Sequence, residues 1–249
     1  GCGRASGSVP RMTLPTGTPV AVVAGAGGAG AAITRALATS GMQVVLLNGT
    51  LPKAAAITDP LAAQGLLART TCINLTDLDA VDEAHRSIVE EFGRIDVLVH
   101  VVGGYHGTST LERASAEDWA SLHPPIVTTL ANLTATMGPT VRDSAHGRVF
   151  ILSSTAVGAP TAGSIAYVAA KTAAEAWMGG VADYFEGSSA AAVVLAIKAL
   201  ATDDMVAADP DKDWSGFTHA DDIATAVLDA CLGPVRNGSR IDLSSGAAS

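Results

Sequence analysis

The chain has 249 residues, 48% of them apolar, and a formal net charge of -9. This length and apolar content are compatible with one sizeable core and predict a single domain. The acidic balance, without any cluster of Lys and Arg, argues against a nucleic-acid or anionic-membrane surface and favours a small-molecule partner. The longest apolar stretches are interrupted by glycines near residue 27 and by Lys198, so we expect no membrane span.

At the start of the chain, residues 1–17 are rich in Gly, Ser, Pro and Thr and contain no apolar signal core. We interpret them as a flexible leader or cloning remnant, followed by one domain over residues 18–249. Cys2, Cys72 and Cys231 lie far apart and form no C-x-x-C pair, which favours neither a disulfide framework nor a zinc site. We therefore expect no metal, a reducing cytoplasmic location, and core positions for Cys72 and Cys231.

From residue 19 onward, short apolar runs alternate with Ala-rich segments of helical character. The candidate strands are residues 19–24, 43–47, 66–73, 95–102, 147–153, 191–197 and 240–243. Between them, segment 77–92 repeats its apolar residues at roughly helical spacing. Strands that are apolar throughout are typical of a parallel sheet covered by helices on both faces. The pattern predicts an α/β fold with a doubly wound, Rossmann-type sheet of about seven strands.

The turn GAGGAG lies between the first candidate strand and the first helix. Gly25, Gly27 and Gly30 fit the pattern G-x-G-x-x-G, whose glycines let the backbone approach a pyrophosphate and aim helix N–H groups at it. In a chain this rich in Gly and Ala, the alternative is a tight turn without a ligand. We expect these three glycines and Gly28 to bind the phosphates of a nucleotide cofactor.

A second pattern consists of Ser154, Tyr167 and Lys171. Tyr167 and Lys171 are four residues apart in a predicted helix and share one face, and Ser154 follows the carboxyl end of a strand, where parallel sheets bind ligands. A phenol can pass a proton, an ammonium can lower the pKa of the phenol, and a hydroxyl can hold a substrate oxygen. One cation about 4 Å away offers roughly the 4 kcal/mol that a tyrosine pKa near neutrality requires.

With these patterns the chain resembles the short-chain dehydrogenase/reductase family over about residues 19–246. The likeness rests on the Gly-rich turn, the spacing of Ser154, Tyr167 and Lys171, IDVLV followed by Gly103, EDW at 117–119 and GSRIDLSSG. The resemblance implies that Ser154 positions a carbonyl or hydroxyl, Tyr167 is the general acid or base, and Lys171 lowers the tyrosine pKa and holds the nicotinamide ribose. It also implies NAD or NADP as cofactor and a ketone or secondary alcohol as substrate.

Two departures from the family pattern lie in the first half of the chain, and they bear on activity more than on fold. The Gly-rich turn is one residue shorter than the usual T-G-x-x-x-G-x-G, and Ala24 stands where threonine is common. After the fourth strand, His100, Val101 and Val102 replace the first three residues of N-N-A-G. Gly103 remains as an expected cofactor contact.

Two further departures lie in the second half. Alignment from EDW places the relay asparagine of the family at Ile126, with Asn132 about two turns further along the helix. The Pro-Gly after the sixth strand reads Lys198 and Ala199, where the ammonium either reaches a phosphate or substrate carboxylate or is structural. These changes leave a second hypothesis, a catalytically weak or silent relative that binds a nucleotide as a sensor or scaffold.

The residue at the end of the second strand, Asn48, bears on the choice between NAD and NADP. A carboxylate there would bind the ribose 2'-hydroxyl and repel a 2'-phosphate, but the amide suits either form. No arginine follows, and Lys53 is the nearest downstream cation, so the choice between NAD and NADP stays open. Asn74 matches the family's aspartate near the adenine, or alternatively forms a turn ahead of the next helix.

Aromatic residues mark two loops near the expected site. His106 with Tyr105 lines the substrate pocket or is simply exposed. Trp214 and Phe217 lie where the family has its substrate-covering loop, and they either close over an apolar substrate or anchor the loop. The aspartates at 221–222 are expected to open the final helix.

Assembly is inferred from the helix that carries Tyr167. It continues through TAAEAWMGGVADYF, whose small residues permit close helix packing, and the family commonly pairs this helix across a two-fold axis. We expect a homodimer or homotetramer. The identity of the substrate and the direction of reaction stay open, because variable loops shape the substrate pocket.

Overall fold

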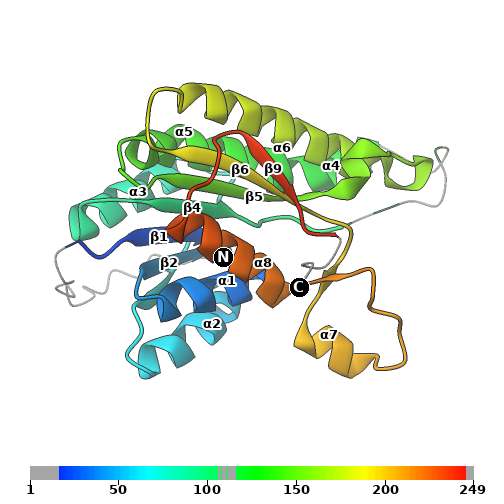
Figure 1. The fold of residues 1–249 in the computed structure, drawn as a ribbon, viewed down its shortest axis with the longest axis horizontal. Helices are drawn as coiled ribbons and strands as arrows, with labels where there is room; N and C mark the ends of the chain where they lie inside the picture. The colour runs from blue at the N-terminus through cyan, green and yellow to red at the C-terminus, as the bar shows by residue number, and fades with distance from the viewer. Residues whose placement is uncertain (1–16, 106, 108–110, 112–115, 245–249) are drawn as a thin grey trace.

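The structure is a computed structural model that describes residues 17–105, 107, 111 and 116–244. Residues 1–16 of the expected leader and His106 lie outside these ranges. The described residues form an α/β fold in which one sheet is enclosed between two layers of helices (Figure 1). Within the same ranges, no helix combines the length and the apolar character that a membrane crossing requires.

Seven parallel strands form the central sheet in the order β3-β2-β1-β4-β5-β6-β9. They are β1 (Val20–Ala24), β2 (Gln43–Asn48), β3 (Ala68–Cys72), β4 (Val97–His100), β5 (Arg148–Ser154), β6 (Ala191–Ile197) and β9 (Ser239–Asp242). Each of the seven apolar runs forms one strand, which confirms the predicted doubly wound sheet. The strand order reverses between β1 and β4, and such a switch point is where open α/β sheets bind ligands.

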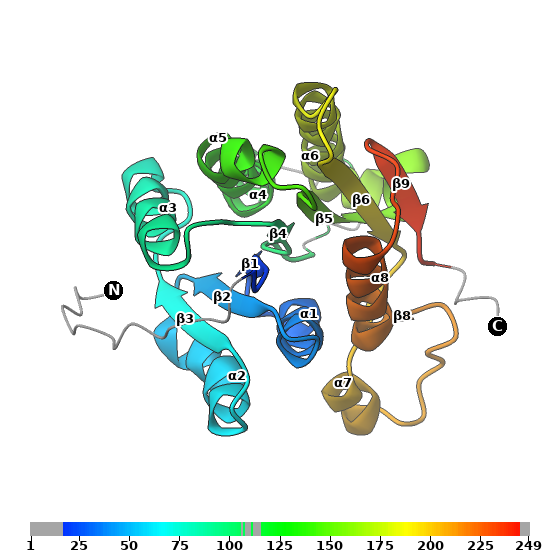
Figure 2. The same cartoon turned by 60° about the vertical axis from the view of Figure 1, so that its left-hand side comes forward.

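Helices cover both faces of the sheet (Figure 2). They are α1 (Gly28–Thr39), α2 (Leu51–Ala63), α3 (Leu78–Phe92), α4 (Ala116–His123), α5 (Thr129–Arg142), α6 (Ile165–Tyr184), α7 (Asp203–Ala208) and α8 (Ala220–Leu232). Along β1, Val20, Val22 and Ala24 face the core shared with α3, α5 and α6. Ala21 and Val23 face the core shared with α1, α2 and α8. Both sides of β1 are buried, which explains its unbroken apolar sequence.

Local signals in the sequence set the helix ends. The Asp77 side chain accepts hydrogen bonds from amides in the first turn of α3, and the helix stops at Gly93, whose φ of +77° favours glycine. Asp221 and Asp222 lie in the first turn of α8, as the sequence predicts, where carboxylates interact favourably with the helix dipole.

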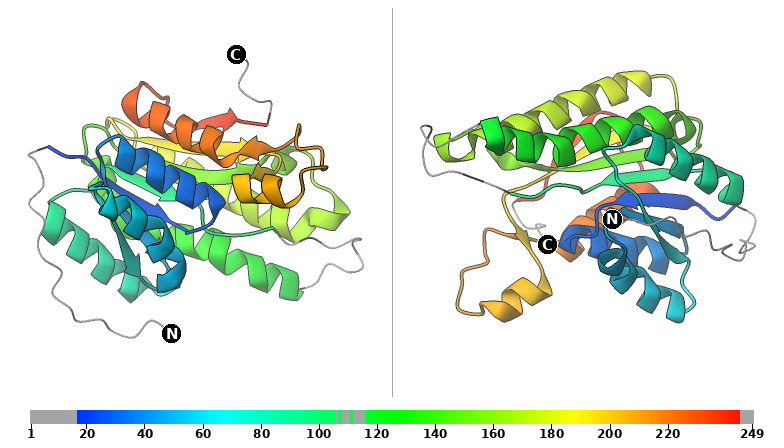
Figure 3. Two further views of the ribbon diagram at one scale, coloured as in Figure 1. Left: turned by 90° about the horizontal axis from the view of Figure 1, so that it is seen from below. Right: turned by 180° about the vertical axis from the view of Figure 1, so that it is seen from behind.

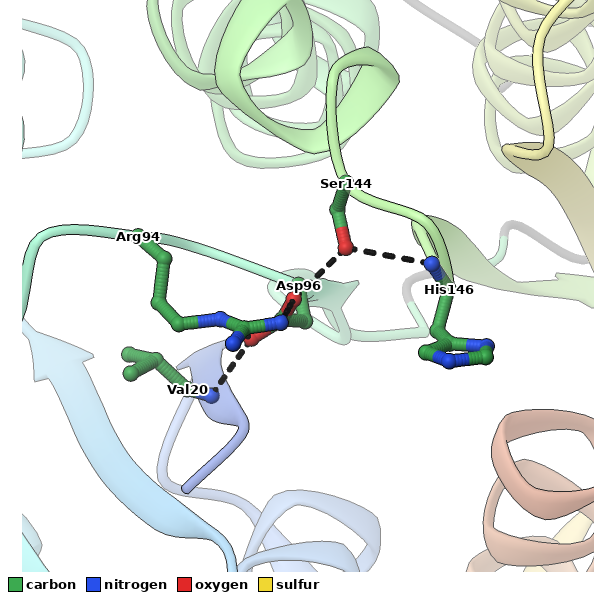
Figure 4. A network of polar contacts seen from close by, with 5 residues as sticks. All are labelled: Val20, Arg94, Asp96, Ser144 and His146. Atoms are coloured by element: carbon green, nitrogen blue, oxygen red, sulfur yellow. Dashed lines mark hydrogen bonds and ion pairs between the residues drawn. The ribbon is translucent and has the colours of Figure 1, made fainter. Parts of the chain in front are cut away.

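At the amino ends of the central strands, Asp96 is buried in a polar network (Figure 4). Its carboxylate accepts hydrogen bonds from the Val20 amide at 2.8 Å, from Arg94 at 2.8 and 2.6 Å, and from the Ser144 hydroxyl at 2.6 Å. Burial alone would raise the pKa of Asp96, but these donors together hold the pKa below its ordinary value. The network ties β1, β4 and the segment before β5 together.

The cysteines differ from their expected core positions. Cys72 ends the edge strand β3, so it is only half-buried, and it is disulfide-bonded. Cys231, in the last turn of α8, is a half-buried free thiol. Burial raises the pKa of Cys231 to about 12, against the opposing charge of Arg148, and this keeps the thiol protonated and unreactive.

Candidate active site

The candidate site lies along the edge where the parallel strands end. The Gly-rich turn follows β1, residues 101–103 follow β4, and Ser154 is the last residue of β5. The chain beyond β6 forms β7 (Leu200–Ala201), α7 and β8 (Thr218–His219), and α7 projects from this edge of the sheet (Figures 1 and 3). The fold therefore brings the Gly-rich turn and the segment of Ser154, Tyr167 and Lys171 to one side of the molecule.

Three glycines of the turn are required by close packing. Gly25 has a φ of +111°, and a Cβ there would stand 3.0 Å from the Val101 backbone. A Cβ on Gly30 would overlap the carbonyl oxygen of Gly25, and one on Gly28 would overlap the Thr202 side chain. The shortened turn thus still brings β1, β4 and α1 into close approach.

Gly27 is different, because its surroundings are open. Apart from Gly27 and its chain neighbours, no atom of the described residues lies within 4 Å of the position that a Cβ would take, and Gly27 has an ordinary extended backbone as the N-cap of α1. Among the described residues, no side chain caps the amides in the first turn of α1. Open space in front of free helix amides suits the pyrophosphate of a dinucleotide, so this turn fits a nicotinamide cofactor.

Ser154, Tyr167 and Lys171 meet where β5 faces α6. Ser154 and Lys171 are buried, with 4% and 8% of their surfaces exposed, and Tyr167 is half-buried. The Ser154 hydroxyl, which accepts a hydrogen bond from the Ala156 amide at 3.2 Å, lies close enough to Tyr167 to act on the acidity of its phenol. The Lys171 ammonium donates to the Leu152 carbonyl at 2.7 Å and lies 5.8 Å from the centre of the Tyr167 ring. The structure therefore brings the three predicted residues together.

The acidity of the tyrosine differs from the expected value. Burial raises the pKa of Tyr167, the nearby Ser154 hydroxyl opposes this change, and nearby Tyr105 adds to it. The expected fall toward neutrality is wrong, because burial is the largest of these causes and the Lys171 ammonium donates to the Leu152 carbonyl. Burial lowers the pKa of Lys171 itself to about 8, and the Glu175 carboxylate limits that fall.

Tyr105 covers the candidate catalytic tyrosine. The two rings lie 5.2 Å apart at an angle of 74°, an edge-to-face contact, while 72% of Tyr105 remains exposed. The contact with Tyr167 suits the pocket-lining interpretation and the exposure suits the alternative of an exposed loop, so both interpretations of Tyr105 stay open. The sequence does not indicate the contact between Tyr105 and Tyr167, because the two residues are far apart in the chain.

His100 occupies the position of the first asparagine of N-N-A-G and is buried. Its Nε2 lies 2.7 Å from the Thr129 hydroxyl, which donates its single proton to the Pro125 carbonyl at 2.8 Å. His100 must therefore donate through Nε2. Burial and the charge of Lys171 lower the pKa of His100 to about 3, so the ring is neutral.

Ile126, at the position expected for the relay asparagine, is surrounded by other buried apolar side chains. Ile126 is buried within a π-helical turn, Pro124–Thr128, that joins α4 to α5. Its side chain fills the space in front of Gly103, where an added Cβ would stand 3.0 Å from it. Asn132 does not take over, because its amide donates to the Leu75 carbonyl at 3.1 Å.

The two asparagines near the expected adenosine pocket are bound to their own turns. Asn48 donates to the Thr50 carbonyl at 3.0 Å and to the Thr50 hydroxyl at 2.9 Å. The Asn74 carbonyl oxygen accepts from the amide and hydroxyl of Thr76 at 3.1 and 2.8 Å. Asn74 thus forms a turn ahead of the next helix, which was the alternative interpretation. The side-chain amides of Asn48 and Asn74 can each make further hydrogen bonds.

The segment after β6 packs largely on itself. The rings of Trp214 and Phe217 lie 4.8 Å apart, and the Lys212 ammonium stands 4.2 and 4.4 Å from their centres. Trp214 also donates to the Asp209 carbonyl at 3.0 Å. These contacts agree with the loop-anchoring interpretation, and Lys198 is exposed beside Gly216.

Sequence reasoning missed Thr202, which lies against Gly28 and caps α7. Its signal is the run T-D-D, typical of a helix start.

The short chain dehydrogenase family model matches residues 19–212. The chain belongs to the short-chain dehydrogenase family. It is accordingly an NAD(P)-dependent oxidoreductase, as its resemblance implies, and a small molecule is its expected substrate. A comparison with curated protein sequences found no match.

Solved structures of this family share the fold over nearly the whole chain. An NADPH-bound short chain oxidoreductase from Pseudomonas aeruginosa PAO1, containing an atypical catalytic center, has a TM-score of 0.83 at 18% identity, over 92% of this chain and 96% of that one. An alcohol dehydrogenase from Thermococcus sibiricus, complexed with 5-hydroxy-NADP, has a TM-score of 0.80 at 24% identity, over 93% of this chain and 98% of that one. A metagenomic short-chain oxidoreductase in complex with NADP has a TM-score of 0.73 at 25% identity, over 90% of this chain and 96% of that one.

Proposed function

We propose that this short-chain dehydrogenase transfers hydride between its nicotinamide cofactor and a ketone or secondary alcohol, with Tyr167 as general acid or base. The observation that carries the proposal is the meeting of Ser154 and Tyr167 beside the buried Lys171, whose ammonium lies 5.8 Å from the centre of the Tyr167 ring. A hydroxyl and a phenol that lie near each other can hold one substrate oxygen between them and exchange a proton with it.

Each residue has a distinct task in this proposal. Ser154 orients the substrate oxygen, and Tyr167 donates a proton to it when a ketone is reduced. Burial raises the pKa of Tyr167, so the phenol carries its proton at neutral pH and is a proton donor there. Lys171 gives one N–H to Leu152 and has two more for ribose hydroxyls. The bound cofactor supplies the hydride.

We further propose that the cofactor is NADP(H). The pyrophosphate would lie at Gly27, with Gly25, Gly28, Gly30 and Gly103 shaping the backbone around it. At the end of β2, Asn48 carries no charge that would repel a 2'-phosphate, and Lys53 is exposed in the first turn of α2. Asn74 would contribute a polar edge near the adenine. The NADP-bound relatives support this choice.

Calorimetric titration with NADPH and NADH tests the cofactor assignment before any substrate is known. We expect micromolar binding of NADPH and binding of NADH that is weaker by about tenfold or more. A screen of ketones, followed by absorbance of the reduced nicotinamide, then tests the reaction. Failure of both cofactors to bind at millimolar concentration would contradict the proposal.

A second candidate function is a nucleotide-binding sensor or scaffold with little catalysis. Three observations favour it: the apolar Ile126 at the relay position, the Lys171 ammonium turned toward Leu152, and the raised pKa of Tyr167. Single-turnover measurements with saturating NADPH separate the two functions. Oxidation of NADPH by a carbonyl compound supports the enzyme, and tight binding without oxidation across a broad panel supports the sensor.

We propose a homodimer or homotetramer built through α5 and α6. A groove of about 800 Å³ lies between these helices, and its lining includes Gly138, Pro139, Ala173, Trp177, Gly180 and Tyr184. Trp177 and Tyr184 are 44% and 50% exposed, which is unusual for such large apolar surfaces on a lone helix face. Light scattering at micromolar concentration should give at least twice the monomer mass, and Trp177→Glu should lower it. A monomeric wild type would contradict the proposal.

The cytoplasmic location stays a prediction. The disulfide bond of Cys72 weighs against it, because proteins of reducing compartments rarely keep such bonds. Fractionation of the source cells with a compartment marker would decide the location.

A further inference from the structure

A polar cluster beside the candidate site links α6, β5 and β9. The Ser153 hydroxyl donates to one Glu175 carboxylate oxygen at 2.5 Å, and Arg240 donates to the other at 3.0 Å. A second nitrogen of Arg240 donates to the Ser154 carbonyl at 3.0 Å. The cluster therefore touches the main chain of Ser154 and lies one helical turn from Lys171.

The Arg240 side chain reaches past the strand with which β9 pairs. β9 already pairs with β6, in a register that sets Arg240 opposite Val194. The Arg240 side chain extends from that edge strand past β6 to the end of β5. Each oxygen of Glu175 has a donor, which compensates for a carboxylate side chain only 16% exposed. The cluster thus fixes the place where β5 ends.

Glu175 also acts on Lys171 through its charge. The two residues are four apart on α6, and the carboxylate opposes the fall in the Lys171 pKa that burial causes. His100 from β4 and Tyr167 from the preceding turn of α6 also face Lys171. His100 is neutral, and burial raises the pKa of Tyr167, so neither brings a charge that replaces the carboxylate at neutral pH. A folded-state lysine pKa near 8 means that the ammonium is present below that pH and lost above it. Removal of the carboxylate would make the loss occur at lower pH.

We propose that Glu175 and Arg240 are a positioning pair, in which Arg240 holds the Ser154 main chain at the end of β5 and Glu175 anchors Arg240 and places its carboxylate one helical turn from Lys171. This inference deepens the proposed function and rests on it. Neither residue touches the substrate or the cofactor in this assignment, since both act through their neighbours.

The test compares Glu175→Gln and Arg240→Lys with a matched control, Glu91→Gln. Glu91 forms an ion pair with Arg69 at 2.9 Å and is similarly buried, with 19% of its side chain exposed. We expect Glu175→Gln to lower kcat for ketone reduction roughly tenfold with little change in KM, and to shift the alkaline limb of the kcat profile to lower pH. Arg240→Lys keeps the charge but not the two-pronged contact with Glu175 and Ser154, so its loss of kcat should be smaller than that of Glu175→Gln, and Glu91→Gln should match the wild type.

A second readout does not depend on turnover. The chain has four lysines, at 53, 171, 198 and 212, so NMR of protein labelled with ¹³C-lysine can follow each titration. In Glu175→Gln, the Lys171 midpoint should move to lower pH while the other three stay. An unmoved midpoint, or a kcat loss no larger than that of Glu91→Gln at equal Tm, would overturn the proposal. If the wild type reduces no carbonyl compound, the proposed function fails while the Lys171 titration still decides the pair.

Discussion

The two ends of the central sheet differ in how their polar groups are used. At the amino ends, Asp96 has two donors on each oxygen, and Arg148 donates to the carbonyls of Ala230, Gly147 and Ser189. At the carboxyl ends, the amides of α1 face open space at Gly27, and Lys171 gives one proton to Leu152. At the amino ends these polar groups make hydrogen bonds within the fold. At the carboxyl ends some hydrogen-bond donors remain for a ligand.

This difference separates stability from activity in space. Substitutions at the amino ends should change the free energy of unfolding with little effect on cofactor binding. Substitutions of the residues that face the expected ligand at the carboxyl ends, such as Tyr167 and Gly27, should do the reverse, since the native packing depends less on them than on the close-packed Gly30. The following predictions test that division, beginning with the largest effect.

Tyr167→Phe should lower kcat for ketone reduction by about 10² to 10⁴-fold, because it removes the proposed proton donor. NADPH affinity should change little, since the ring remains. The control is Tyr184→Phe, the same substitution on an exposed residue of the same helix. Steady-state rates and calorimetry measure both effects, and undiminished turnover in Tyr167→Phe would exclude its catalytic role.

Asp96→Asn should lower the free energy of unfolding by about 3 kcal/mol, because Arg94 loses its buried carboxylate partner. Urea denaturation at neutral pH measures this loss. The Kd for NADPH, measured well below the denaturation midpoint, should stay within about twofold. A large loss of affinity with unchanged stability would show that the division between the two ends is wrong.

The same carboxylate predicts how stability depends on acid. The pKa of Asp96 lies below its ordinary value of 3.8 in the folded chain, so its contribution is complete above that value. The contribution falls as the pH drops below 3.8 through the folded pKa. Asp96→Asn should remove this part of the pH dependence. Equal slopes of stability against pH for both proteins would contradict the assignment.

Gly27 and Gly30 belong to the same turn, and their substitution by alanine should have different effects on stability and on NADPH affinity. Gly30→Ala should cost about 1 to 3 kcal/mol of stability, because the new Cβ overlaps the Gly25 carbonyl. Gly27→Ala should change stability by less than about 0.5 kcal/mol, since its surroundings are open. Its NADPH affinity should nevertheless fall by roughly tenfold. Wild-type affinity in Gly27→Ala would mean that the cofactor does not approach there.

The sequence predicted the sheet and the meeting of Ser154, Tyr167 and Lys171, because both depend on local patterns. Strands of four to seven residues, most of them in apolar runs, are long enough to be recognised in the sequence. The pair Tyr167 and Lys171 is four apart on one helix, so the helical period alone places both on one face. The two-residue strands β7 and β8 were missed, since they are too short to show any period.

The properties that the sequence did not predict depend on distant parts of the chain. The raised pKa of Tyr167 follows from burial and from Tyr105, and the position of the Lys171 ammonium follows from a carbonyl in β5. Glu175 and Arg240 are 65 residues apart and meet only because β9 joins the sheet beside β6. Asn74 had two interpretations, and only its contact with Thr76 favours the turn.

The late position of Arg240 has a consequence during synthesis on the ribosome. A nascent chain that already contains Ser154, Tyr167 and Lys171 must still be extended by 65 residues from Glu175 before Arg240 is made. At cellular elongation rates this takes on the order of 3 to 13 seconds. During that interval Glu175 and the end of β5 have no arginine from β9, so translation speed sets when a newly made molecule can first assemble its complete site.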